Sequence, residues 1–218
     1  YNWVQDNIKK VDKASNGKIG YIYIPDMGPE GLNEFSRYFY PQLNKEGLII
    51  DDRANGGGNV SPMILERLSR EPYRLTMRRG SARIGTVPDA VQVGPKVCLI
   101  NKYSASDGDL FPWGFRALGL GKLIGTRTWG GIVGISGSLP YMDGTDIRVP
   151  FFTSFDPKTG SWIIENHGVD PDILIDNDPV KEWNGEDQQL DRAIQEVMKE
   201  LQDRKPLPGV PTPRDFSK

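Results

Sequence analysis

The sequence contains very few of the residues that most often bind metals or cross-link chains. Its 218 residues include one cysteine, Cys98, and one histidine, His167. A single thiol excludes a disulfide within the chain, and a single imidazole excludes a metal site built from several histidines. The acidic residues show no metal-ligand spacing, and there is neither a P-loop nor a dinucleotide fingerprint. We therefore expect chemistry that uses no metal and no cofactor.

Long apolar runs and long runs of one charge are also missing. The longest apolar stretches are as short as strands, so we expect no membrane-spanning helix and no membrane partner. The 27 basic and 29 acidic residues give a formal net charge of -2, which argues against a nucleic-acid partner. The chain begins Tyr1-Asn2-Trp3, without an initiator Met or the regions of a signal peptide. We expect a piece of a larger protein of the cytoplasm, which the low cysteine content also fits.

Segments with the periodicity of strands and helices alternate along most of the chain. The strand-like runs are 18–25, 47–51, 96–100 and 123–124, and the helix-like segments between them are 31–43, 60–70 and 111–118. This order predicts a mainly parallel α/β sheet with right-handed helical crossovers. Short β-like runs with many glycines over 126–165 predict a β-rich region at the edge of the sheet, and 187–201 predicts a terminal helix. We expect a core over 1–203 and a proline-rich tail over 204–218.

A serine lies where the predicted strand 96–100 leads into the following helix. The connecting sequence is Ser104-Ala105-Ser106-Asp107. A serine at such a junction is rigid and exposed, and the unpaired N–H groups of the helix N-terminus favour an alkoxide or oxyanion. The alternative is that the serine only caps the helix, with acidic residues in the first turn.

Three consecutive glycines, Gly56, Gly57 and Gly58, follow the predicted strand 47–51. Such a run costs backbone entropy, so it suits a sharp turn or a backbone that presents N–H groups to a ligand. Its alternative is an ordinary flexible loop. Open α/β sheets bind ligands at this end of their strands. Together with the serine junction, the loop would form a minimal acyl-transfer site.

The remaining candidates lie in the β-rich region. Glu165 ends a β-like run and could orient a hydroxyl or an imidazole, although it could also be a plain surface glutamate. His167 is the only candidate base in the chain, and we favour a loop histidine without a catalytic role. The glycine-rich run 126–135 could present a strand edge, including Gly134 and Ile135, to an extended peptide, or it could be a bulged edge strand.

These segments together resemble the tricorn protease family, within the wider family of C-terminal-processing serine peptidases. The likeness covers nearly the whole chain, in the right order, up to about residue 203. The segments that carry it are Asn16-Gly17-Lys18-Ile19-Gly20-Tyr21-Ile22, Pro25-Asp26-Met27-Gly28, Arg53-Ala54-Asn55-Gly56-Gly57-Gly58, Ser106-Asp107-Gly108-Asp109, Gly119-Leu120-Gly121-Lys122-Leu123-Ile124-Gly125-Thr126-Arg127-Thr128-Trp129-Gly130-Gly131 and Glu165-Asn166-His167-Gly168-Val169-Asp170-Pro171-Asp172.

The resemblance implies a crotonase-like (ClpP/crotonase-type) fold and the second catalytic subdomain of a serine peptidase. It assigns Ser106 as the nucleophile, the N–H groups of Gly58 and Asp107 as the oxyanion hole, and Glu165 as the group that orients the catalytic relay. In the processing peptidases the first serine attacks with the help of a lysine. Here Trp129-Gly130-Gly131 stands at the place of that lysine, which favours Ser106 over Ser104.

The resemblance also predicts what lies outside this chain. In the family a first catalytic subdomain supplies the general-base histidine, PDZ-like and propeller domains accompany it, and trimers pair into hexamers. The substrates would be short peptides. A family carboxylate that selects basic P1 side chains falls on Leu75 or Thr76, so we expect apolar P1 residues instead. The alternatives are a crotonase-type acyl-CoA enzyme and a degenerate, non-catalytic peptide-binding domain.

Overall fold

The computed structural model describes residues 2–81, 84–137 and 139–212. Its centre is a parallel sheet with the strand order β1-β2-β5-β6-β9. The strands are β1 (Ile19–Tyr23), β2 (Gly47–Asp51), β5 (Lys96–Ile100), β6 (Gly121–Gly125) and β9 (Ile173–Leu174). The order in space follows the order along the chain, and the predicted parallel α/β fold is confirmed.

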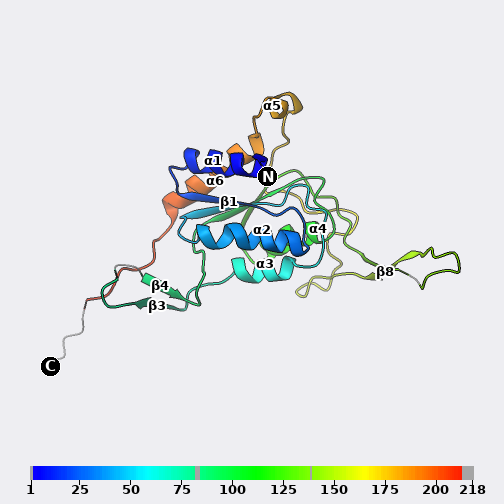
Figure 1. Ribbon diagram of the computed structural model, residues 1–218, viewed down its shortest axis with the longest axis horizontal. Coiled ribbons are helices and arrows are strands. Elements are labelled where there is room, and N and C mark those ends of the chain that lie inside the picture. Colours follow the sequence, from blue (N-terminus) through cyan, green and yellow to red (C-terminus); the bar gives the residue numbers. More distant parts are fainter. Residues whose placement is uncertain (1, 82–83, 138, 213–218) are drawn as a thin grey trace.

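Helices cover both faces of this sheet (Figure 1). The crossover helices α2, α3 and α4 pack on one face, and α1 and α6 pack on the other. Their bounds are α1 (Asn2–Ala14), α2 (Pro29–Phe39) with the 3-10 turn Tyr40–Gln42, α3 (Ser61–Leu68), α4 (Asp107–Ala117) and α6 (Gln188–Asp203). No helix among the described residues is long and apolar enough to cross a membrane.

Two apolar cores arise because alternate side chains of a strand point to opposite faces. Ile50 and Cys98 pack towards α2, α3 and α4, whereas Ile49 and Val97 pack towards α1 and α6. Both faces of β2 and β5 are therefore covered, and every residue of these two strands is buried. This burial explains why the two strands read as continuous apolar runs.

The predicted β-rich edge is wrong in its placement. Strands β7 (Gly134–Gly137) and β8 (Arg148–Phe152) form a separate antiparallel ribbon. The edge position beside β6 is taken by β9, so the ribbon extends away from the sheet (Figure 1). Every residue of β8 is exposed, among them large apolar side chains such as Phe151, which is 77% exposed.

Sequence patterns also missed a hairpin and a short helix. Strands β3 (Arg74–Met77) and β4 (Ile84–Val87) pair antiparallel, and α5 (Pro179–Trp183) precedes α6. The β3–β4 hairpin lies beside the C-terminal segment in Figure 1, and Pro208 and Val210 share a cavity with it. The described part of the predicted tail therefore meets the hairpin, and residues 213–218 lie outside the described residues.

Candidate active site

Ser106 lies between β5 and α4 in a backbone conformation that non-glycine residues rarely adopt. Its φ is 58° and its ψ is -119°. Such a conformation costs on the order of 1–3 kcal/mol, which the surrounding structure must offset. Ser106 occupies the N-cap position of α4, but its side chain makes no capping hydrogen bond. The residue is exposed, and its hydroxyl has no hydrogen-bond partner among the described residues. The capping alternative for this serine is therefore wrong.

Ser104 has the opposite environment, although it is only two residues away. It is fully buried, and its Oγ donates a 2.8 Å hydrogen bond to the carbonyl of Asp52. Its own carbonyl accepts the N–H of Trp129 at 2.9 Å. A hydroxyl buried in this way supports the turn and is closed to a substrate. Of the two serines, only Ser106 is exposed.

The glycine loop passes directly over the serine turn. A Cβ on Gly57, whose φ is +95°, would lie 2.6 Å from the Cβ of Ser106 and 2.9 Å from the N of Asp107. On its other side the loop pairs with Met27, which donates to the carbonyl of Gly57 at 2.9 Å. A Cβ on Gly58, at φ +150°, would meet the Met27 carbonyl at 2.0 Å. These close approaches explain why glycine is needed at both positions.

Two backbone N–H groups beside Ser106 have no acceptor. They belong to Gly58 and Asp107, and neither takes part in a hydrogen bond among the described residues. Asp107 is the first residue of α4, where an unpaired N–H and the positive end of the helix dipole favour negative charge. The structure therefore brings the segments of three predicted site residues together, and the backbone N–H groups of two of them have no acceptor among the described residues.

Asn55 holds this arrangement together, and sequence reasoning did not single it out as a site residue. It is fully buried. Its Oδ1 accepts the N–H of Gly57 at 2.9 Å, and its Nδ2 donates to the carbonyl of Ile24 at 3.1 Å. Its own carbonyl accepts the N–H of Ala105 at 2.8 Å. One side chain and one carbonyl thus tie the glycine loop to the serine turn.

The carboxylate of Asp107 points away from its free N–H and binds the start of α3. It accepts the N–H of Ser61 at 2.9 Å, and it also accepts the Ser61 hydroxyl. Asp107 is buried, so both helix N-termini share one negative charge. This contact fixes the orientation of α3 against α4, the two helices that begin on either side of the site.

Below the serine turn lies a carboxyl group without a partner. Asp52 is fully buried, and neither of its carboxyl oxygens has a hydrogen bond within the described chain. Burial raises the pKa of Asp52 well above its usual value, and the charges of Asp51, Asp107 and Asp109 raise it further. Asp52 is therefore a buried carboxylic acid that resists ionisation.

Glu165 is half-buried, and its carboxylate binds the segment that leads into β7. Its Oε2 accepts the N–H groups of Ile132 at 2.7 Å and Val133 at 2.9 Å. Its Oε1 has no partner among the described residues. No hydrogen bond joins Glu165 to Ser106 in this chain, so any orienting role must pass through a further group.

The predicted peptide-binding residues Gly134 and Ile135 follow directly after that segment. They begin β7, which pairs with β8 along one edge only. Its other edge is unpaired in the described chain. Such an edge can add an extended peptide through main-chain hydrogen bonds. The location agrees with the prediction for these two residues, and their role stays a prediction.

The Nε2 atom of His167 lies within hydrogen-bond distance of Asp170 Oδ2, at 2.7 Å, and its imidazole is exposed. It lines a cavity of about 730 Å³ with Trp113 and Arg116, on a side of α4 that does not include Ser106. The structure does not bring the chain's single imidazole to the serine. This agrees with the expectation that His167 is not the base.

Leu75 and Thr76 lie in β3, away from the serine. They line a cavity of about 380 Å³ with Ile84 and Pro208. Figure 1 shows the hairpin of β3 and β4 at the side of the molecule opposite to β8. The described chain alone therefore does not bring these two residues to Ser106, and their part in substrate selection stays a prediction.

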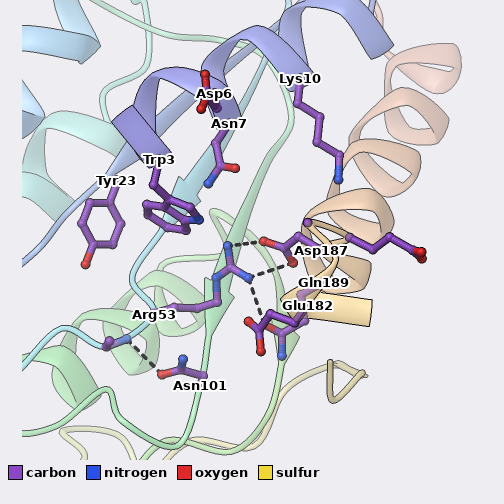
Figure 2. Close-up of a pocket in the computed structure, with 13 residues that line it drawn as sticks. Trp3, Asp6, Asn7, Lys10, Tyr23, Arg53, Asn101, Glu182, Asp187 and Gln189 are labelled. Carbon is purple, nitrogen blue, oxygen red and sulfur yellow. Dashed lines mark hydrogen bonds and ion pairs between the residues drawn. The ribbon is translucent and has the colours of Figure 1, made fainter. Parts of the chain in front are cut away.

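A polar cavity of about 470 Å³ adjoins the glycine loop on the α1 and α6 face (Figure 2). Arg53 lies in its wall, and its guanidinium makes four hydrogen bonds and an additional ion-pair contact. Asp51 accepts from Nε at 2.9 Å and from one terminal nitrogen at 2.6 Å. Asp187 and Gln189 accept the others, at 2.8 to 3.1 Å. The guanidinium therefore anchors the loop through two carboxylates and an amide.

An exposed, strained serine at the carboxyl edge of a parallel sheet, with free backbone amides in the adjoining segments, is an arrangement typical of the nucleophile sites of serine hydrolases. Residues 18–175 match the family model described as peptidase family S41. The chain belongs to this family.

Curated relatives carry the name of tricorn protease. The protein of Thermoplasma volcanium is 45% identical over 203 residues, covering 92% of this chain and 19% of the relative. A relative from Sulfurisphaera tokodaii, named a putative tricorn-like protease C-terminal subunit, is 41% identical over 93% of this chain and 23% of its own length. The chain thus spans about a fifth of the length of these relatives.

Solved structures agree with this assignment. A crystal structure of the tricorn protease superposes with a TM-score of 0.86 at 44% identity, over 92% of this chain and 19% of that one. The photosystem II D1 C-terminal processing protease gives a TM-score of 0.53 at 22% identity, over 72% of this chain and 42% of that one. This second likeness shows the α/β fold alone.

Proposed function

We propose that this chain is the nucleophile-bearing part of a tricorn-like serine peptidase that hydrolyses short peptides. The observation that carries the proposal is the exposed, strained Ser106, which precedes the free N–H group of Asp107 and lies against the glycine loop. The Ser106 oxygen attacks the scissile carbonyl carbon while a base accepts its proton. The N–H groups of Gly58 and Asp107 stabilise the oxyanion, the peptide C–N bond breaks, and the amine leaves with a proton. Water then releases the acyl group.

The base comes from another part of the complete protein. The hydroxyl of Ser106 has no partner among the described residues, and His167 binds Asp170 instead. Glu165, with one oxygen still free, orients the relay that reaches Ser106. We therefore expect this chain alone to be nearly inactive, with a residual rate of order 10³–10⁴ over water. The complete protein should cleave peptides at an ordinary enzymatic rate.

A fluorophosphonate probe on the complete protein tests the nucleophile. Labelling should disappear in Ser106→Ala and persist in Ser104→Ala, which removes a buried hydroxyl from the same turn. Retained labelling in Ser106→Ala would refute the assignment. Tight binding of coenzyme A would instead support an acyl-CoA enzyme. Peptide binding without labelling or turnover would support a non-catalytic binding domain.

The compartment, the further domains and the assembly of the complete protein are proposed from the same resemblance. The complete protein works in the cytoplasm, carries a first catalytic subdomain, PDZ-like and propeller domains, and assembles as a trimer or hexamer. Light scattering on the complete protein measures the last point. A strictly monomeric mass would contradict it.

A further inference from the structure

Every backbone N–H group from Thr128 to Val133 donates a hydrogen bond, and the six bonds reach four other residues. Thr128 donates to the Val169 carbonyl at 3.2 Å, and Trp129 donates to the Ser104 carbonyl at 2.9 Å. The next four amides bind two carboxylates. Gly130 and Gly131 donate to Asp109, and Ile132 and Val133 donate to Glu165. Strand β7 begins at the following residue.

Asp109 has no accessible surface, and both of its oxygens serve this segment. Oδ1 accepts the N–H of Gly130 at 2.8 Å, and Oδ2 accepts that of Gly131 at 3.3 Å. Asp109 also belongs to the turn that carries the nucleophile, because its own N–H donates to the Ser106 carbonyl at 2.9 Å. A single residue therefore joins the nucleophile turn to the segment that enters β7.

We propose that Asp109 is a positioning residue that fixes β7 relative to Ser106, and so aligns an extended peptide with the nucleophile. This inference rests on the proposed peptidase function and on β7 as the peptide-binding edge. Asp109 contacts the backbone of Ser106 but makes no hydrogen bond with its hydroxyl or with the proposed oxyanion donors, the N–H groups of Gly58 and Asp107. Its loss should therefore misplace long substrates while the serine stays reactive.

The substitution Asp109→Asn in the complete protein separates these two effects. The side chain keeps its size, but an NH₂ group replaces one oxygen and faces an amide donor, so one glycine N–H loses its acceptor. Asp143→Asn is the matched control. Asp143 also accepts a backbone N–H, from Thr145 at 3.0 Å, but it lies in the exposed turn of the ribbon.

Two rates are measured, namely labelling of Ser106 by a small fluorophosphonate and kcat/KM for a series of peptides of increasing length. For Asp109→Asn we expect labelling within about twofold of wild type. The ratio of kcat/KM for long peptides to kcat/KM for short peptides should fall by about tenfold or more. Asp143→Asn should change neither rate. An unchanged length dependence, or labelling that falls as much as peptide turnover, would overturn the proposal.

A second variant covers the case in which Asp109→Asn does not fold. Asp109→Glu keeps the charge and moves the carboxylate by one methylene, and the same loss of length dependence is expected. If the wild-type protein neither labels nor cleaves peptides, the proposed function itself fails, and the inference about Asp109 fails with it. If the wild-type enzyme is active and the Asp109 variant shows the same dependence of kcat/KM on peptide length, only the inference about Asp109 is overturned.

Discussion

Gly57 lies so close to Ser106 that a Cβ on the glycine would be 2.6 Å from the serine Cβ. The glycine loop and the serine turn therefore touch directly, without a side chain between them. The proposed oxyanion donor Gly58 is the next residue after this contact. The contact also leaves no room for a side chain at Gly57.

Substitution Gly57→Ala should abolish most reactivity. The new methyl would meet Ser106 and the N of Asp107, and alanine is strained at a φ of +95°. We expect fluorophosphonate labelling of the complete protein to fall by about 10²–10³, as when one oxyanion donor is lost. Gly56→Ala is the control, because a Cβ at Gly56 has no atom within 4 Å. Equal losses in both variants would show that the contact with Ser106 is not what matters.

Ser104→Ala should change stability and leave the chemistry intact. The variant loses the buried hydrogen bond from the Ser104 hydroxyl to the Asp52 carbonyl. The expected cost is about 1 kcal/mol in the free energy of unfolding. For a chain of this size that corresponds to a Tm lower by roughly 2–4 °C. Calorimetry measures the shift, and the labelling rate should stay near that of wild type. A complete loss of labelling would return Ser104 to the list of possible nucleophiles.

Arg53→Met should be strongly destabilising. It would leave Asp51, which is fully buried, and Asp187 without their shared cation. Removing one partner of a buried ion pair typically costs about 3–5 kcal/mol. Arg148→Met removes an arginine whose ion pair is exposed and 3.8 Å long, so its effect should stay within about 0.5 kcal/mol. Urea unfolding of both variants gives the comparison, and similar values for the two would contradict the role of Arg53.

The buried acid Asp52 predicts a pH dependence with a definite sign. Burial raises the pKa of Asp52 in the folded chain, whereas the unfolded chain releases this proton near pH 4. Between these two pKa values the folded state holds more protons, so this group lowers stability as pH rises. The slope is at most about 1.4 kcal/mol per pH unit.

Asp52→Asn removes this titration and keeps the shape of the side chain. The variant should therefore gain stability relative to wild type as pH rises from about 4 towards the raised pKa. The difference in unfolding free energy between the two proteins, measured across pH, isolates this one group. A difference that does not change with pH would show that Asp52 is ionised or satisfied in the folded chain.

Substrate preference offers a further test. By the resemblance, Leu75 and Thr76 match the position at which other family members have a carboxylate that selects basic P1 side chains. An apolar pocket cannot offset the desolvation of a Lys or Arg head group, but it gains from burying Leu or Phe. We expect the complete protein to show its highest kcat/KM with Leu or Phe at P1. A higher value for Arg or Lys in matched peptides would mean that an acid elsewhere reaches the pocket.

The sequence was sufficient for the parts of the fold that local patterns determine. Buried strands such as 96–100 read as apolar runs, and the serine and glycine segments lay at their carboxyl ends, where parallel strands meet. The anchoring roles of Asn55 and Asp109 could not be predicted, because they depend on partners far away in sequence, such as Ile24 and Ala105 for Asn55 and Gly130 for Asp109. In the chain these residues are only a turn asparagine and a first-turn acid, and such residues usually serve local caps.

The position of the β7–β8 ribbon was predicted wrongly for a different reason. Its residues have the composition of a sheet edge, but the two residues of β9 take that edge instead. A strand this short leaves almost no periodic signal. Strand propensity also reflects how a segment packs, and it does not say which sheet a segment will join.

The position of Cys98 has a practical consequence for experiments on this protein. It is the only thiol in the chain, it is fully buried, and it lies in β5, the middle strand of the central sheet. Burial also raises the pKa of the thiol, so the reactive thiolate is scarce in the folded chain. A thiol reagent should therefore modify a molecule only while its central sheet is open. The rate of modification then reports global unfolding under native conditions, without an introduced label.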